Sequence, residues 1–254
     1  MYVFLSLTFF HLMNLVIDIG NTLVKAAVFK EDSLAFKASF PKENFVAEAN
    51  LISGQFNIER AILSNVSHSP ENFDSLLIDK ENLLILDQDT KVPFKNLYST
   101  PQTLGVDRIA LMAGAAVQFP FKNTLVIDAG SCITYDFLDG ENNYFGGAIS
   151  PGIEMRYKAV HQQTAKLPLL KPVTEIPRIG NSTENAIHLG VLNGVIQEID
   201  GIIAQYEALY DNFTTILTGG DAIFLSKNLK STIFAKPNFL LEGLNGILIH
   251  NLDE

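Results

Sequence analysis

The sequence has little of what several classes of protein require. It contains one cysteine, Cys132, which excludes an intrachain disulfide and fits a reducing compartment. Its formal net charge is −10 and no basic stripe runs along it, so we expect neither nucleic acid nor an anionic membrane as its main partner. Its five histidines lack the spacing of metal ligands, which argues against a zinc site. To bind a polyphosphate, so acidic a chain would need a divalent cation.

The composition is that of a folded globular protein, with 47% hydrophobic and 18% charged residues. A length of 254 residues suits two domains, which we place at residues 13–119 and 120–254. Residues 1–12 are almost wholly apolar but lack the basic segment and cleavage site of a secretory signal. We interpret them as the product of a start codon assigned too far upstream. The alternative is a real extension that packs as an edge strand or lies disordered.

Residues 15–25 read LVIDIGNTLVK, a run of strand formers that ends in Asp18, turns at Gly20-Asn21 and returns as a second strand. An aspartate at the end of a buried strand is costly unless a cation or hydrogen-bond donors meet it. The turn supplies backbone N–H groups and a hydroxyl, and Lys25 lies on the return strand. The hairpin therefore predicts a phosphate-binding turn with a metal-binding carboxylate at its base.

The same pattern returns in residues 125–134, LVIDAGSCIT, where Asp128 follows Asp18 at an offset of 110 (128 − 18). Chance similarity between two core strands is the alternative, but the matching Asp and Gly are not core residues. An internal repeat sets the architecture of a chain. Two such hairpins predict an α/β protein with two similar domains that face each other across a nucleotide cleft.

The remaining segments alternate between strands and helices, an order that favours mixed sheets covered by helices. We expect further strands at residues 34–40, 61–66, 83–86 and 214–217, and helices at residues 41–51, 70–78, 109–119 and 153–166. Asn181 and Glu184 have capping-box spacing, which predicts a helix running to about residue 209. Residues 240–249 are expected to close the chain as a packed helix or as a strand followed by a helix.

Glycines mark backbone that turns tightly or approaches another group. Residues 146–152 hold three glycines and a proline, and Gly190, Gly194 and Gly201 would let another backbone come close to the predicted long helix. Gly219-Gly220 follows a predicted strand and would leave room for a flat nucleoside. A plain turn from strand to helix explains that pair equally well.

Asp107 is a third acidic candidate, because Gly105-Val106-Asp107-Arg108 precedes a predicted alanine-rich helix. An N-cap is a simple explanation for this aspartate, but a cap needs neither the preceding glycine nor the following arginine. If Asp107 faces an acceptor hydroxyl, it can take its proton as a general base while Arg108 holds an anionic group of the acceptor.

The other two acids would then serve the Mg²⁺ and phosphate side of a phosphoryl transfer. Asp18 and Asp128 would lie near a Mg²⁺-bound triphosphate, with the turn amides and the hydroxyls of Thr22 and Ser131 on its oxygens. Phosphoryl transfer asks little more of a protein than this positioning and charge neutralisation.

Five motifs together resemble those of the type III pantothenate kinase family, and they span residues 14 to about 249. In chain order they are Asp18-x-Gly-Asn-Thr-x-x-Lys25, Gly105-x-Asp-Arg108, Asp128-x-Gly-Ser131, Gly146-Gly-x-Ile-x-Pro-Gly152 and Gly180-x-Ser-Thr183. The resemblance implies two ribonuclease H-like domains of the acetate and sugar kinase, heat-shock ATPase and actin superfamily. It also implies a cytoplasmic homodimer that phosphorylates pantothenate with ATP, the first step of coenzyme A biosynthesis.

Carried over by position, the resemblance assigns three sets of residues. It places ATP on Asp18, Ile19, Gly20, Asn21, Thr22, Leu23, Val24, Lys25 and Ser131. It makes Asp107 the proton acceptor and places pantothenate near Tyr98, Gly105, Val106, Asp107, Arg108 and Thr183. It gives Asp128 the monovalent cation, K⁺ or NH₄⁺, that family members require beside Mg²⁺. At Ser131-Cys132 the family more often shows Thr-Ala, but the serine keeps the hydroxyl, so we expect activity to survive.

Three other functions fit parts of the pattern. A related small-molecule kinase would act on a different hydroxyl, which Tyr98, the segment Gly105 to Arg108 and Thr183 argue against. A transcriptional accessory factor of the same family would not need Asp107 together with both hairpin acids. An actin-type scaffold would usually be larger and would lack the Gly-x-Asp-Arg turn.

Overall fold

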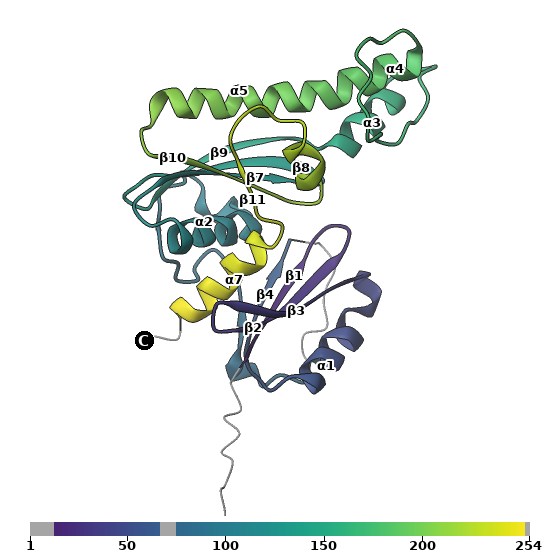
Figure 1. The fold of residues 1–254 in the computed structure, drawn as a ribbon. Coiled ribbons are helices and arrows are strands. Elements are labelled where there is room, and N and C mark those ends of the chain that lie inside the picture. Colours follow the sequence, from purple (N-terminus) through teal and green to yellow (C-terminus); the bar gives the residue numbers. More distant parts are fainter. Residues whose placement is uncertain (1–12, 67–74, 252–254) are drawn as a thin grey trace, which may run out of the picture.

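The computed structural model describes residues 13–66 and 75–251, which form two β-sheets with helices between and outside them (Figure 1). The apolar segment 1–12 and most of the helix predicted at residues 70–78 lie outside the described residues.

The first sheet has the strand order β3-β2-β1-β4-β5. Its strands are β1 (Met13–Ile19), β2 (Val24–Lys30), β3 (Ser33–Phe40), β4 (Ile58–Asn65) and β5 (Leu83–Ile85). The central strand β1 pairs antiparallel with β2 and parallel with β4. It reads as a nearly continuous apolar run because both of its faces are covered. The helix α1 (Phe45–Gln55) packs on the outer face, opposite the second sheet.

The second sheet repeats this plan, with the order β11-β10-β7-β8-β9-β6. Its strands are β6 (Lys95–Asn96), β7 (Asn123–Ala129), β8 (Cys132–Leu138), β9 (Asn143–Pro151), β10 (Phe213–Thr218) and β11 (Phe234–Ala235). The central strand β7 pairs antiparallel with β8 and parallel with β10, as β1 pairs with β2 and β4. The duplication that the two hairpins predict is therefore present in the strand topology.

A shared layer of two helices lies between the sheets. The helices α2 (Val106–Gln118) and α7 (Phe239–His250) pack on each other and fill one core together with inward-facing residues of both sheets, such as Val16 and Val126. From the first half, α2 contacts β8 as well as β4, and from the second half, α7 contacts β1 and β4. The domain boundary at residue 119 stays a prediction, since helices from both halves build this layer.

The outer face of the second sheet is covered by a long helical segment (Figure 1). It consists of α4 (Thr183–His188), a π-helical turn (Leu189–Asn193) and α5 (Gly194–Leu209), with α3 (Ile153–Gln162) and α6 (Ala222–Ser226) beside it. By length and composition the segment could cross a membrane, but Ile187, Val191, Val195 and Ile199 pack into the core of the second sheet. It therefore serves as a core helix of the fold.

Several details differ from the sequence-based predictions. The cap of α4 is Ser182, whose hydroxyl accepts a hydrogen bond from the Asn185 N–H, so the prediction of Asn181 was wrong by one residue. The N-cap of α2 is Gly105, so Asp107 lies in the first turn and is not a cap. Residues 240–249 lie in the helix α7, which is one of the two forms expected for them.

The glycines of the long helix and of residues 146–152 differ in role. Among the described residues nothing lies within 4 Å of a Cβ built on Gly190, Gly194 or Gly201, so no backbone of this chain approaches them. Residues 146–151, by contrast, continue strand β9. There a Cβ on Gly147 would meet the carbonyl oxygen of Tyr135 at 1.6 Å. This glycine therefore lets the backbones of β8 and β9 come close together and does not form a turn.

The crossing of α2 and α7 yields a stability prediction. A Cβ on Gly243 would lie 2.0 Å from the carbonyl oxygen of Ala110, so Gly243→Ala must force the helices apart. Overpacking of this kind costs about 1–3 kcal/mol. Gly246→Ala is the matched control on the same helix, because its new methyl would lie 3.5 Å from Val117. Since alanine is the better helix former by roughly 0.5–1 kcal/mol, Gly246→Ala should be neutral or stabilising. Urea unfolding measures both, and equal effects would refute this account of the crossing.

Candidate active site

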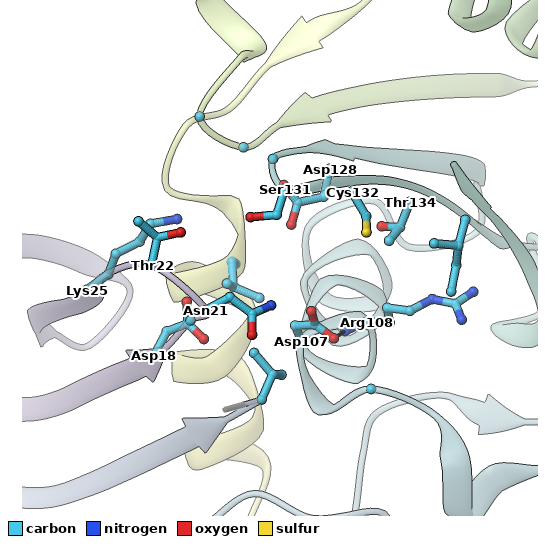
Figure 2. Close-up of a pocket in the computed structure, with 18 of the residues that line it drawn as sticks. Asp18, Asn21, Thr22, Lys25, Asp107, Arg108, Asp128, Ser131, Cys132 and Thr134 are labelled. Carbon is cyan, nitrogen blue, oxygen red and sulfur yellow. Dashed lines mark hydrogen bonds between the residues drawn. The ribbon is translucent and has the colours of Figure 1, made fainter. Parts of the chain in front are cut away.

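A cavity of about 520 Å³ opens between the two sheets, at the hairpin ends of β1 and β7 (Figure 2). Both hairpins, the start of α2 and the turn after β10 contribute to its wall. The lining includes Asp18, Gly20, Asn21, Thr22, Leu23, Lys25, Tyr98, Gly105, Asp107, Arg108, Asp128, Ser131, Cys132, Thr134, Gly219 and Gly220.

Strand geometry explains why Asp18 and Asp128 face the same space. Side chains alternate between the faces of a strand, so Asp18 shares the inner face of β1 with Val16, while Leu15, Ile17 and Ile19 point toward α1. On β7, Asp128 shares the inner face with Val126 in the same way. Each central strand therefore directs its carboxylate toward the layer between the sheets, where Figure 2 shows both side chains pointing into the cavity.

Asp18 is buried and Asp128 is half-buried, and loss of hydration is the main cause of their altered acidity. Burial raises the pKa of Asp18 to about 7, against the lowering effect of Lys25, and the charges of Asp107 and Asp128 raise it further. Burial likewise raises the pKa of Asp128 to about 6, again opposed by Lys25 and assisted by Asp107. The mutual influence of these groups shows that the three acids share one electrostatic environment.

Several polar atoms of this region lack a partner within the described part of the chain. Asp18 Oδ1, Ser64 Oγ on the neighbouring strand β4 and Thr134 Oγ1 on β8 are buried without a hydrogen bond. Unpaired buried polar atoms are costly, and oxygens of these types bind Mg²⁺, K⁺ or the donors of a ligand. The donor set therefore fits a site for hard cations and phosphate.

Asp107 lies in the first turn of α2, across the cavity from Asp18 (Figure 2). Its Oδ1 accepts a hydrogen bond of 2.8 Å from the backbone N–H of Arg108. Burial raises the pKa of this carboxyl, although that hydrogen bond opposes the rise. A Cβ at position 105 would lie 2.5 Å from Asp107 Oδ1, so Gly105 makes room for the carboxylate. This explains the glycine that a simple cap would not need.

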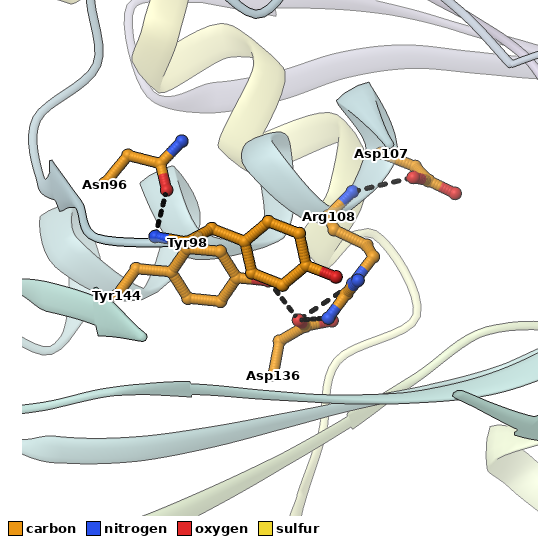
Figure 3. Close-up of polar contacts among 6 residues, drawn as sticks. All are labelled: Asn96, Tyr98, Asp107, Arg108, Asp136 and Tyr144. Atoms are coloured by element: carbon orange, nitrogen blue, oxygen red, sulfur yellow. Dashed lines mark hydrogen bonds and ion pairs between the residues drawn. The ribbon is translucent and has the colours of Figure 1, made fainter. Parts of the chain in front are cut away.

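Arg108, the predicted contact for an anionic group of the acceptor, forms a buried ion pair. Its guanidinium is held by Asp136, with 2.9 Å from Nε and 2.6 Å from Nη2 to Asp136 Oδ1 (Figure 3). The Tyr144 hydroxyl donates to the same oxygen at 2.7 Å. Sequence analysis missed Asp136 and Tyr144. The only signal was an aspartate inside a predicted strand, which has to be paired if it is buried.

Most of the predicted site residues meet at the cavity, and four do not line it. The backbone of Ile19, Val24 and Val106 is in the right segments, but their side chains belong to the hydrophobic cores. Thr183 begins α4, beside α3 on the outer side of the second sheet (Figure 1).

Gly219, in the turn after β10, does line the cavity. It has φ +96° and packs against Asp128, since a Cβ at this position would lie 2.4 Å from Asp128 Oδ1.

Comparison with known proteins decides the family. The family model for type III pantothenate kinase matches residues 14–205. A type III pantothenate kinase from Christiangramia forsetii is 48% identical over 94% of this chain and 99% of its own length. One from Flavobacterium johnsoniae is 47% identical over 95% of this chain and 99% of its own length. This chain belongs to the type III pantothenate kinase family.

Solved structures support the fold of this family member. A Baf family protein from Campylobacter jejuni, described as a transcriptional activator, aligns with a TM-score of 0.63 at 23% identity, covering 94% of this chain and all of the other. A protein from Listeria monocytogenes described as an N-acetylmannosamine kinase aligns with a TM-score of 0.52 at 12% identity, over 95% of this chain and all of the other. At such identities the likeness shows the fold alone, and that fold agrees with the predicted α/β class.

The raised pKa of Asp18 predicts a pH-dependent stability of the ligand-free kinase. An unfolded aspartate titrates near pH 4, whereas Asp18 titrates near 7, so between these values only the folded protein holds the proton. The free energy of unfolding therefore falls as the pH rises from about 4 to about 7. Asp18→Asn removes this loss, so the ligand-free variant should exceed wild type by about 1–3 kcal/mol at pH 8 and lose its advantage toward pH 4.

Urea unfolding across this pH range measures the effect. The matched control is Asp200→Asn, because Asp200 accepts hydrogen bonds from the backbone N–H groups of Lys230 and Ser231, away from the cavity. That variant should be less stable than wild type at pH 8. A destabilised Asp18→Asn at the same pH would contradict the proposed cost of the buried charge.

Proposed function

We propose that this protein transfers the terminal phosphate of ATP to pantothenate, the first step of coenzyme A biosynthesis. The observation that carries the proposal is the meeting of three acids from separate segments at one cavity, two on matching hairpins and Asp107 opposite them. Membership of a family whose curated relatives are type III pantothenate kinases supports the same substrate. The reaction also implies a cytoplasmic location, where its substrates would be found.

The hairpin side would bind the nucleotide. The turn from Gly20 to Leu23 and Ser131 offer backbone N–H groups and hydroxyls for phosphate oxygens. Lys25 on β2 lies directly opposite Asp18 on β1. Mg²⁺ when bound neutralises the charge of the triphosphate, and Asp18 with its unpaired Oδ1 is suited to hold it directly or through water. Asp128 is assigned to K⁺ or NH₄⁺.

The α2 side would bind the acceptor. Asp107 is the general base that takes the proton of the pantothenate hydroxyl as the oxygen attacks phosphorus. A raised pKa brings this carboxyl closer to the operating pH, which suits a base that must give the proton up again. Arg108 and Tyr98 lie beyond Asp107 along the cavity wall and would contact the acceptor's own carboxylate.

Thr183 fits this scheme only in a homodimer. The family resemblance assigns it to pantothenate, yet it does not line the cavity of its own chain. A second copy packed against the outer face of the second sheet would supply Thr183 to the partner's cavity. The glycines 190, 194 and 201 on that side have no close neighbour among the described residues, which leaves them open to such a partner.

A purely regulatory role and a different small-molecule substrate are the competing functions. The structural likeness to a protein described as a transcriptional activator concerns the fold and not the activity. A regulator needs no buried acid with an unpaired oxygen, such as Asp18, because its burial destabilises the ligand-free protein. A panel of alcohol substrates separates pantothenate from other acceptors.

The direct test is a phosphorylation assay with pantothenate, ATP, Mg²⁺ and K⁺. We expect 4′-phosphopantothenate to form, and we expect turnover to fall when K⁺ is exchanged for Na⁺ at equal ionic strength, because the smaller ion fits the oxygens at Asp128 less well. Reactions without pantothenate control for ATP hydrolysis. Absence of product in K⁺ would sink the proposed function, and indifference to Na⁺ would remove the monovalent cation from Asp128.

Asp107→Asn tests the general base. The amide keeps the shape of the carboxylate but cannot accept the proton, so kcat should fall about 10²–10⁴-fold. ATP affinity should stay within about twofold of wild type, because Asp107 lies on the acceptor side. Steady-state kinetics and calorimetric titration with ATP measure the two quantities, with Asp200→Asn as the matched control. Wild-type turnover in Asp107→Asn would exclude it from the mechanism.

A further inference from the structure

Asp136 is a fully buried carboxylate that neither lines the cavity nor contacts the hairpin acids, yet it is bonded to an acceptor-side residue. It accepts hydrogen bonds from Arg108 Nε and Nη2 and from the Tyr144 hydroxyl. Figure 3 shows these groups converging on one side chain, with Asp107 on the far side of Arg108.

The register of β8 puts Asp136 directly behind the cavity wall. Because side chains alternate along a strand, Cys132, Thr134 and Asp136 share one face of β8. The first two line the cavity, whereas Asp136 lies two residues further along and out of reach of a ligand in it. Whatever Asp136 does for the reaction, it does through Arg108 and the tyrosines.

The ion pair also controls which face of Arg108 is available. Burial alone lowers the pKa of the guanidinium, but the hydrogen bonds and charge of Asp136 outweigh this effect and keep it protonated. Two of its three nitrogens bond to Asp136, which fixes the plane of the group and leaves Nη1 as the nitrogen not bound to it. A carboxylate fixes a guanidinium more firmly through two such bonds than through one.

Tyr98 is held by the same cluster. Its ring stacks on Tyr144 with centroids 6.1 Å apart, and the Arg108 guanidinium carbon lies 5.5 Å from its centroid. Beneath it, Gly146 has φ +119°, and a Cβ there would lie 2.9 Å from the Tyr98 ring. Tyr144 and Arg108 are the two neighbours of the Tyr98 ring, and Asp136 forms hydrogen bonds with both of them.

Stability alone does not explain a pair of this kind. Replacement of a buried ion pair by apolar residues of similar volume is often neutral or stabilising, because desolvation of the two charges offsets their attraction. The pair does supply a guanidinium and a phenol ring at fixed positions in the cavity wall.

We propose that Asp136 is a positioning residue that orients Arg108 and Tyr98 to receive the carboxylate of the acceptor. This inference rests on the proposed function, because it concerns how that substrate is held. The carboxylate of the acceptor would then bind to a guanidinium whose donors are already aligned by the protein. It would not have to fix a mobile side chain. Loss of the alignment should weaken acceptor binding and leave the nucleotide side unchanged.

Asp136→Asn is the test, because asparagine keeps the volume but cannot hold the guanidinium through two charge-assisted bonds. We expect the KM for pantothenate to rise at least about tenfold, with kcat within about threefold and the KM for ATP within about twofold of wild type. Asp200→Asn, with the same chemical change at a carboxylate remote from the cavity, should alter none of these values. Circular dichroism and thermal melting show whether each variant is folded.

A double-mutant cycle tests whether Asp136 acts through Arg108. If it does, Asp136→Asn should add little to the KM effect of Arg108→Met, because the group it positions is already absent. Additive effects would overturn the proposal, as would an unchanged KM for pantothenate or an equal rise in both KM values. An inactive wild-type protein would instead overturn the proposed function itself.

Two milder variants keep the proposal testable if Asp136→Asn does not fold. Tyr144→Phe removes one hydrogen bond to Asp136 but keeps the ring on which Tyr98 stacks, and should raise the KM for pantothenate about two- to fivefold. Gly146→Ala displaces the Tyr98 ring without contacting Asp136 and should also raise this KM while the KM for ATP stays unchanged. Wild-type pantothenate KM values in both variants would refute the role of the cluster.

Discussion

Two carboxylates that face one cavity impose the constraint on which the rest of the structure depends. Asp18 and Asp128 occupy positions in central strands where an apolar side chain would be more stable. The charge of Asp107 raises the pKa of both, and the charge of Asp128 also raises that of Asp18. Of the residues described along the cavity wall, only Lys25 and Arg108 carry positive charge, and Arg108 is already paired. The cavity wall therefore carries an excess of negative charge, which is costly while it is uncompensated.

The helix layer between the sheets sets how far apart these acids lie. The helices α2 and α7 pack on each other and on both sheets, so the distance from the first hairpin to the second follows from how closely the helices cross. Gly243 against Ala110 makes that approach close. Because α2 also carries Asp107 in its first turn, the same helix contact fixes the position of Asp107 relative to both hairpins. The packing of the core therefore determines the geometry of the cavity.

The sequence was sufficient for features that recur or are local. The repeated hairpins predicted the duplicated topology, because a period-two strand with a terminal aspartate fixes both the pairing and the face of that side chain. It was insufficient where partners lie far apart in the chain. Asp136 lies 28 residues from Arg108, and nothing in that spacing says that they bond. The position of Thr183 depends on how α4 packs outside the second sheet, which local patterns do not encode. Helix caps were missed by one or two residues, since neighbouring polar residues compete for the same role.

The pairing of Arg108 with Asp136 changes what this arginine can offer an anionic ligand. As a lone cation at the mouth of a helix, it would attract an anionic acceptor through its net charge over several ångströms. Paired with Asp136 it has almost no net charge to offer, and its contribution becomes the direction of its remaining donors. The pair also affects Asp107, because the charge of Arg108 lowers the pKa of that carboxyl and the charge of Asp136 raises it. Asp136 thereby offsets the charge of Arg108 beside Asp107, so these two neighbouring side chains at the start of α2 influence each other less.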